Sequence, residues 1–208
     1  MESKSQEPAK TKNNDFDYFF QVLILGDIGT GMRSVCSYYI NGDYQAWIYK
    51  LGFEKKYVEY EGKVAQLQIW GRHGAERGAP LPRIYYKSLD GIFLMYDVTN
   101  CSSFESIEKY KSIIDECAPS YCQTVLFGHK ADDEESRKVS FAAGSELASK
   151  LGLPFFEGSA KLGSGVYEAF DKLTALMVAK AIEDKRDTKI RFRKKDASKD
   201  EKRGCAVF

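Results

Sequence analysis

Residues 19–34 read FFQVLILGDIGTGMRS, in which an apolar run passes through a glycine-rich loop into a segment of helical period. Gly26 and Gly31 hold the frame positions of the pattern GxxxxGK followed by Ser or Thr, where backbone N–H groups surround phosphate at a helix N-terminus. Met32 stands at the lysine position and Arg33 at the position of the hydroxyl that binds magnesium. Glycine-rich turns also occur for packing reasons, so the loop alone leaves both interpretations open. The candidate phosphate site consists of Gly26, Asp27, Ile28, Gly29, Thr30, Gly31, Met32, Arg33 and Ser34.

Apolar runs and segments of helical period alternate along the rest of the chain. This alternation predicts an α/β fold with a mostly parallel sheet that is covered by helices on both faces. Glu61-Gly62 predicts a tight hairpin turn, which would add one antiparallel edge strand. The predicted strands are 19–25, 64–70, 91–96, 124–127 and 155–156, with the hairpin strand around 58–60, and the predicted helices are 31–40, 102–117, 140–151 and 165–182.

Composition predicts one domain with flexible ends. The 208 residues, 43% of them hydrophobic, can bury one good core but are short for two. The formal net charge of +1 argues against binding to nucleic acid, which needs a basic face that neutralises phosphates. Five unevenly spaced cysteines do not resemble a disulfide framework and fit a reduced, cytosolic chain. We expect a disordered lead-in at 1–14, a folded domain at 15–183 and a basic tail at 184–208.

Four further motifs resemble those of one protein family. LQIWGRHGAER at 67–77 resembles LQIWDTAGQER of the Rab family, and IFLMYDVT at 92–99 resembles the strand that follows it. GHKAD at 128–132 resembles the base-reading GNKxD, and EGSAK at 157–161 resembles ExSAK. With the glycine-rich loop, these motifs occur in the family's order and spacing over about 16–182. The chain therefore resembles a Rab-type small GTPase of the Ras superfamily.

The resemblance implies a P-loop NTPase fold of the small GTPase type: a six-stranded, mostly parallel sheet with helices on both faces and nucleotide at the carboxyl ends of the strands. It also implies that Lys130 lies along the base, that Asp132 accepts hydrogen bonds from guanine N1 and N2, and that Ala160 offers its backbone N–H to O6. His129 stands at the asparagine position and would make different hydrogen bonds. The candidate guanine site consists of His129, Lys130, Asp132, Ser159, Ala160 and Lys161.

By the same resemblance, the residues for magnesium and hydrolysis are missing. Gly71 replaces the aspartate that holds magnesium, Ala75 replaces the glutamine that orients attacking water, and Gly74 is kept as a candidate phosphate residue. Residues 38–87 contain no Ser or Thr, so the first switch region has no threonine. Losing about three charge-assisted contacts at roughly 1.5–3 kcal/mol each would weaken nucleotide binding by about three to six decades. We expect weak binding of GTP or GDP, no magnesium and no catalytic residue.

Two arginines offer a substitute for the metal. Arg33 and Arg72 occupy or adjoin former magnesium-ligand positions, so we hypothesise that their guanidinium groups hold a phosphate without metal. The alternative is that both are ordinary solvated surface arginines. A metal site shared by His73 and His129 is disfavoured, because the two are far apart in sequence and lack the short spacing of zinc ligands.

The switch region predicts a fixed surface for protein partners. Without a γ-phosphate and magnesium to hold the switch loops, hydrolysis has nothing to release. Pro80 and Pro82 limit backbone freedom and favour one extended shape. We therefore hypothesise a locked, nucleotide-insensitive partner surface that includes Trp47, Phe53 and Trp70. The alternative is that Trp47 caps a loop and that Phe53 and Trp70 are ordinary sheet residues.

The C-terminus predicts a lipid anchor. Cys205-Ala206-Val207-Phe208 matches a CaaX box, and its terminal Phe favours geranylgeranylation. Lys and Arg are frequent over 185–203, and a lipid together with a basic tail supplies the two signals needed for stable membrane attachment. The alternative is a disordered basic tail with an unused cysteine. We expect Cys205 to anchor the chain to the cytoplasmic face of an endomembrane or of the plasma membrane.

These observations leave three functions open. The first is a Rab-like, membrane-anchored protein of intracellular vesicle trafficking that recruits effector proteins and hydrolyses GTP poorly. The second is a divergent but working GTP/GDP switch with GTPase activity. The third is a decoy for the prenylation and delivery machinery. Metal-dependent GTP turnover separates the second from the others, and recruitment of effectors to a membrane separates the first from the third.

Overall fold

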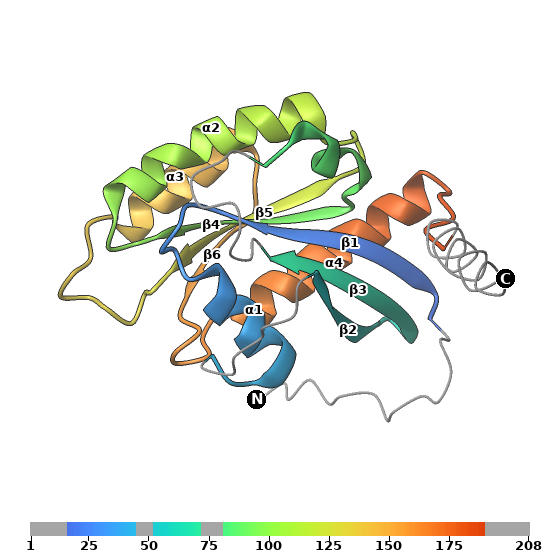
Figure 1. Ribbon diagram of the computed structural model, residues 1–208, viewed down its shortest axis with the longest axis horizontal. Coiled ribbons are helices and arrows are strands. Elements are labelled where there is room, and N and C mark those ends of the chain that lie inside the picture. Colours follow the sequence, from blue (N-terminus) through green and yellow to red (C-terminus); the bar gives the residue numbers. More distant parts are fainter. Residues whose placement is uncertain (1–15, 45–51, 72–80, 190–208) are drawn as a thin grey trace, which may run out of the picture.

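The computed structural model describes residues 16–44, 52–71 and 81–189, which form one six-stranded sheet between two layers of helices (Figure 1). The strands lie in the order β2-β3-β1-β4-β5-β6, and the pairs from β3 through β6 are parallel. The predicted α/β fold with a mostly parallel sheet is confirmed. The strands are β1 (Tyr18–Leu25), β2 (Phe53–Tyr60), β3 (Lys63–Gly71), β4 (Gly91–Asp97), β5 (Gln123–His129) and β6 (Phe155–Gly158).

The predicted hairpin joins β2 to β3 and supplies the antiparallel edge strand. Glu61 and Gly62 at its turn have φ of 50° and 72°. This left-handed conformation at both central residues is what a two-residue hairpin turn of the favoured type requires. The resulting register places Phe53 opposite Trp70.

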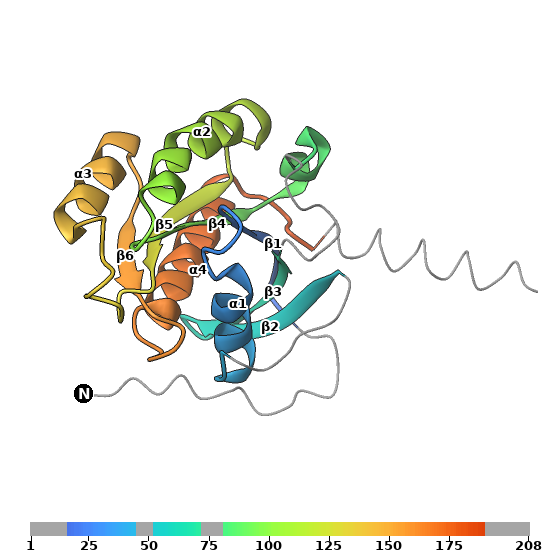
Figure 2. The ribbon, with the colours of Figure 1, turned by 60° about the vertical axis from the view of Figure 1, so that its left-hand side comes forward.

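Helices cover both faces of the sheet. They are α1 (Met32–Asn41), α2 (Cys101–Cys117), α3 (Phe141–Leu151) and α4 (Val166–Glu183). Figures 1 and 2 show α1 and α4 on one face and α2 and α3 on the other. Asn100 and Ser140 cap α2 and α3 through their side-chain oxygens, whereas α1 begins after Gly31 with no side-chain cap. Within the three described segments, no helix combines the length and the apolar composition needed to cross a membrane.

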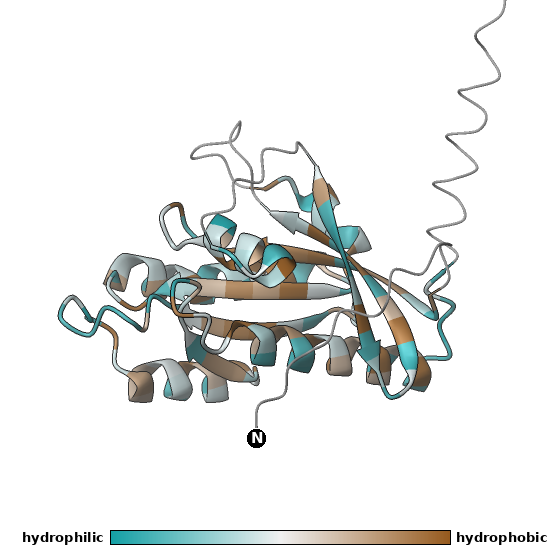
Figure 3. Ribbon diagram, turned by 90° about the horizontal axis from the view of Figure 1, so that it is seen from below, coloured by the Kyte–Doolittle hydropathy of each residue, from teal (hydrophilic) through white to brown (hydrophobic). Residues whose placement is uncertain are grey.

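The central strand β1 is buried on both faces. Phe20, Val22 and Ile24 join the apolar cluster under α1 and α4, whereas Leu23 and Leu25 join the cluster under α2 and α3. Because successive side chains point to opposite faces of a strand, burial on both faces requires an unbroken apolar run. Figure 3 shows mostly hydrophobic residues along the central strands and a mixture of hydrophobic and hydrophilic residues along the helices.

Two parts of the fold were not predicted. The short 3-10 helix η1 (Arg83–Ser88) precedes β4, and a helix of this length is too short to show a period. After α4, Arg186 donates to the Asp90 carboxylate, and the Thr188 hydroxyl accepts from the N–H of Phe19 at 3.0 Å. Contacts with the sheet therefore extend past the boundary predicted at residue 183. The lead-in at 1–14 and the tail from 190 onward, with Cys205, lie outside the described residues.

Candidate functional site

The glycine-rich loop follows β1 at the carboxyl end of the sheet and leads into α1. Surrounding atoms require glycine at its frame positions. A Cβ on Gly26 would lie 2.4 Å from the carbonyl oxygen of Met95, and Gly31 has a φ of 91°. Thr30 closes a turn, since its N–H and its hydroxyl both donate to the carbonyl oxygen of Asp27, at 3.3 and 2.8 Å. The candidate phosphate residues thus form one loop and the first turn of α1.

The second residue of this loop is held by α2. Asp27 accepts hydrogen bonds from the hydroxyls of Ser106 and Tyr110, each at 2.7 Å. Ser106 and Tyr110 are one helical turn apart, so both hydroxyls lie on the same face of α2. The sequence did not predict this contact, because Ser106 and Tyr110 lie 79 and 83 residues from Asp27 and no local pattern connects them to it.

His129, the last residue of β5, connects two loops. Its Nδ1 lies 2.7 Å from the carbonyl oxygen of Thr30, and the backbone N–H of Ala160 donates to its Nε2 at 3.2 Å. Since a carbonyl can only accept and a backbone N–H can only donate, these partners assign the neutral tautomer with hydrogen on Nδ1. Burial lowers the pKa of His129, and the Thr30 carbonyl, which favours the charged form, only partly opposes this shift.

Lys130 follows β5 with a φ of 65°, and its Nζ lies 2.6 Å from Oδ2 of Asp97 at the end of β4. Asp97 also accepts from the N–H and the hydroxyl of Thr99, at 2.9 and 2.7 Å. Burial alone would raise the pKa of Asp97, but the hydrogen bonds from Lys130 and Thr99 outweigh it and lower the pKa. The side chain expected to lie along a base is therefore paired with a carboxylate of the neighbouring strand.

Asp132 faces the loop that follows β6. Burial alone would raise the pKa of Asp132, but the hydrogen bond from Ser159 and the charge of Lys161 help to lower it. The Nζ of Lys161 lies 3.7 Å from Oδ2 of Asp132. The hydroxyl oxygen of Ser159 accepts from the N–H groups of Lys161 and Leu162, at 3.1 and 3.3 Å. The fold thus brings the candidate guanine residues together from two loops at one edge of the sheet.

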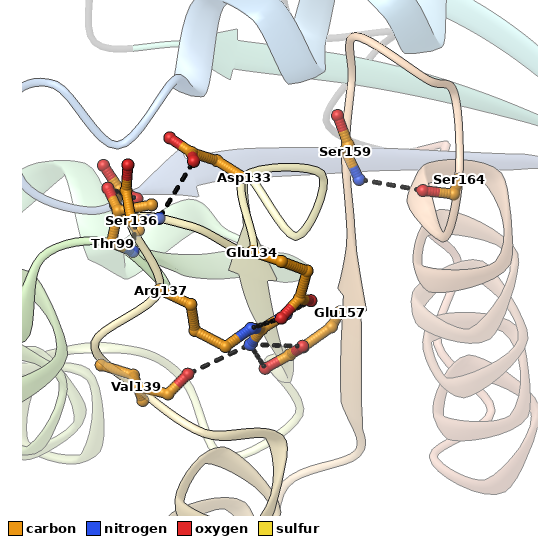
Figure 4. Close-up of polar contacts among 10 residues, drawn as sticks. Thr99, Asp133, Glu134, Ser136, Arg137, Val139, Glu157, Ser159 and Ser164 are labelled. Carbon is orange, nitrogen blue, oxygen red and sulfur yellow. Dashed lines mark hydrogen bonds and ion pairs between the residues drawn. The ribbon is translucent and has the colours of Figure 1, made fainter.

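Arg137 braces the loop between β5 and α3. Figure 4 shows its guanidinium between two carboxylates, 2.9 Å from Oε1 of Glu134 and 3.0 Å from Oε2 of Glu157. The same guanidinium donates to the carbonyl oxygen of Val139 at 3.1 Å. Because Glu157 belongs to β6, this contact ties the loop to the strand that leads into the Ser159 loop. Side chains of the chain itself therefore hold both loops.

Comparison with known proteins decides the family. A model of the Ras family matches residues 21–179. Over 166 residues the chain is 36% identical to Ras-related protein Rab-15 of Rattus norvegicus, with 78% of each protein covered. The chain is a Rab-type small GTPase of the Ras family. This small GTPase is also 37% identical over 161 residues to Ras-related protein RIC1 of Oryza sativa subsp. japonica, covering 76% of this chain and 80% of the relative. It is 34% identical over 177 residues to Ras-related protein SEC4 of Candida albicans, covering 84% of both.

Membership in the family implies binding of GTP and GDP in general, and the two residues that follow Gly31 differ from the patterned lysine and metal-binding hydroxyl. Magnesium takes oxygen ligands in octahedral geometry. Met32 packs against the apolar cluster under α1, and Arg33 is exposed. Among the residues that the structure describes, no group of three or more His, Cys, Asp and Glu side chains could hold a metal ion. Gly71 ends β3. Arg72, His73 and Gly74, which were considered as phosphate or metal ligands from the sequence, lie outside the described segments.

Two aromatic residues of the predicted partner surface lie side by side on this small GTPase. The rings of Phe53 and Trp70 are 5.0 Å apart between centroids, and both residues are half-buried. They are therefore sheet residues that keep part of their surface exposed, and the partner surface stays a prediction. On η1, Ile84 and Tyr85 are 64% and 52% exposed, which sequence analysis did not anticipate. Trp47 and Pro80 lie outside the described residues.

Proposed function

We propose that this small GTPase is a membrane-anchored protein of vesicle trafficking that binds guanine nucleotide weakly and without magnesium, and hydrolyses GTP poorly. One observation carries the proposal: Met32 packs against the core and Arg33 is exposed where the phosphate-loop pattern has its lysine and its metal-binding hydroxyl. Lysine and magnesium both neutralise phosphate charge, in the bound nucleotide and in the transition state of hydrolysis. The half-buried thioether of Met32 does neither, so both affinity and turnover should be low.

Contacts within the chain support a role that does not depend on nucleotide. Asp27 is bonded to two hydroxyls of α2, and Thr30 bonds back to the Asp27 carbonyl. Arg137 ties the β5–α3 loop to β6. These contacts hold the loops through groups of the chain itself. A domain of this kind can present one shape to its partners in all nucleotide states.

The surface offered to effector proteins would include Phe53, Trp70 and the exposed side chains of η1. Aromatic residues are enriched in protein interfaces. Tyr86 fixes η1 to the core, since it is only 1% exposed, and an ion pair between Arg83 and Glu116 joins η1 to α2. Because η1 is held by core packing, we expect this surface to bind partners equally with GTP and GDP.

The basic tail would carry the membrane anchor. Thr188 and Arg186 fasten residues 184–189 near the amino ends of β1 and β4, opposite the phosphate loop. A tail at 190–208 that leaves from this end would keep the loops at the carboxyl edge of the sheet away from the bilayer. The relatives named Rab-15 and SEC4 are consistent with a trafficking role, and the CaaX box at Cys205 supplies the attachment point.

A working GTP/GDP switch is the second candidate. Asp132 favours it, because this carboxylate stands where the family resemblance places the acceptor for the N1 and N2 hydrogens of guanine. Metal-dependent hydrolysis by the purified protein would support this candidate over the first.

Calorimetric titration of GTP and GDP into the nucleotide-stripped protein, with magnesium and again with EDTA, tests the proposal. We expect weak affinity that is the same in both buffers. The double variant Met32→Lys/Arg33→Ser is the matched comparison, because it restores the patterned lysine and hydroxyl. It should bind GTP and GDP at least about tenfold more tightly than the wild type when magnesium is present, and no more tightly in EDTA. Tight, magnesium-dependent binding by the wild-type protein would overturn the proposal and favour the switch.

A further inference from the structure

His129 occupies an unusual position between the two loops that should hold a nucleotide. One ring nitrogen contacts the phosphate loop at Thr30, and the other contacts the loop that follows β6, at Ala160. The ring is nearly inaccessible, with the residue only 5% exposed. It therefore fills space between the loops and links them directly.

The surroundings of the imidazole are shaped to hold it. A Cβ on Gly31 would lie 2.4 Å from both Cε1 and Nδ1 of the ring, so glycine is needed there for the ring to fit against the loop. On the strand side, the ring of Phe127 stacks beside it, with centroids 6.2 Å apart and planes inclined by 30°. The imidazole is thus enclosed by the phosphate loop on one side and by its own strand on another.

The hydrogen bonds of His129 occupy the donor that guanine O6 would need. The ring has one hydrogen, on Nδ1, and the Thr30 carbonyl accepts it. The backbone of Ala160 has one N–H hydrogen, and Nε2 of His129 accepts it. That N–H is the donor which the family resemblance assigns to guanine O6. A purine could use it only if the imidazole first moved away.

The geometry points to His129 as an internal substitute for the base, which bridges Thr30 and Ala160 and holds the domain closed without a nucleotide. This inference rests on the proposed function, because it explains how a weakly binding member of the family keeps its site ordered. The other polar groups at the edge are satisfied similarly: Lys130 pairs with Asp97, and Asp27 with hydroxyls of α2. Guanine nucleotide must then compete with contacts that the chain already makes.

An asparagine variant separates the two halves of the bridge. The amide nitrogen of asparagine lies one bond beyond Cγ, as Nδ1 of histidine does, so His129→Asn can still donate to the Thr30 carbonyl. Nothing in asparagine reaches the place of Nε2, which lies one bond further out. The variant therefore frees the Ala160 N–H while keeping the contact with the phosphate loop.

The experiment combines NMR of the ¹⁵N-labelled, nucleotide-free protein with titration of GDP, and of ADP as a control ligand. In the wild-type protein we expect the Nδ1–H tautomer of His129 and an Ala160 amide that is protected from hydrogen exchange. In His129→Asn that protection should be lost, and GDP should bind about tenfold more tightly than to the wild type, while ADP affinity stays unchanged. Adenine offers an amino group at this position and cannot accept from the Ala160 N–H.

An unprotected Ala160 amide in the wild-type protein, or equal GDP affinity for the two proteins, would overturn the inference. If the variant does not fold, the tautomer of His129 and the protection of the Ala160 amide in the wild-type protein are sufficient to test the inference. The proposed function fails on a different measurement, namely tight magnesium-dependent binding by the wild type. The ratio of affinities between variant and wild type still tests the bridge in that case.

Discussion

Replacing Asp27 with alanine should release the glycine-rich loop from α2. The half-buried carboxylate accepts two hydrogen bonds, each 2.7 Å long, from Ser106 and Tyr110. A hydrogen bond to a charged group contributes about 1.5–3 kcal/mol, and partial exposure to water reduces each of these to about 1 kcal/mol. We therefore expect Asp27→Ala to lower the free energy of unfolding by about 2 kcal/mol.

Urea denaturation of the nucleotide-free domain measures this change, and a double-mutant cycle with Tyr110→Phe isolates one of the two bonds. Tyr110→Phe removes only the hydroxyl, so the coupling energy with Asp27→Ala should be about 1 kcal/mol. Tyr85→Phe is the matched control, because Tyr85 is 52% exposed on η1. Its effect should add independently to that of Asp27→Ala.

Additivity of Asp27→Ala and Tyr110→Phe within about 0.3 kcal/mol would refute the reasoning. The hydrogen bonds to α2 would then contribute nothing to holding the loop. The His129 bridge would then be the contact that orders the phosphate loop without a ligand.

The remaining predictions concern His129, the end of α4 and the tail. The pKa of His129 lies below the ordinary value of about 6.5 in the folded state, so the unfolded chain binds the proton first. The free energy of unfolding should therefore fall as the pH falls below about 6.5, and His129→Asn should show a smaller fall in the same denaturation series. Arg186→Ala should lower the free energy of unfolding by about 3 kcal/mol, because Asp90, at 1% exposed, would lose its charged partner. Adding Asp90→Asn should recover part of that loss in the same urea denaturation assay. Cys205→Ser should move the chain from membranes to the soluble fraction of cells while Cys101→Ser should not, and equal membrane fractions would contradict the anchor.

The secondary structure could be predicted because burial leaves a periodic record in the sequence. The apolar run predicted at 19–25 corresponds to β1 (Tyr18–Leu25), and the helical period at 165–182 corresponds to α4 (Val166–Glu183). Each of these elements contributes many apolar residues to the core, so the pattern repeats several times within one element. The hairpin at Glu61 and Gly62 was likewise predictable, since its turn depends on two adjacent residues.

The polar contacts of the site could not be predicted in this way. His129 and Thr30 are 99 residues apart, and Arg186 and Asp90 are 96 residues apart. A single polar side chain leaves no period, and whether it forms a hydrogen bond depends on distances of a few tenths of an ångström that only the folded chain sets. The sequence predicted that His129 would bond differently from asparagine, but not which groups it would contact.

The residues of the phosphate-loop pattern therefore differ in what they reveal about function. Gly26 and Gly31 are needed by the fold itself, since a Cβ on Gly26 would strike the Met95 carbonyl and one on Gly31 would strike the His129 ring. Their presence would be required even if no nucleotide ever bound. Met32 and Arg33 bear directly on binding, because the fold accommodates Met32 through simple packing and leaves Arg33 exposed. A glycine frame is thus weak support for nucleotide binding in this chain, and the two residues that follow it are the ones whose replacement should change affinity.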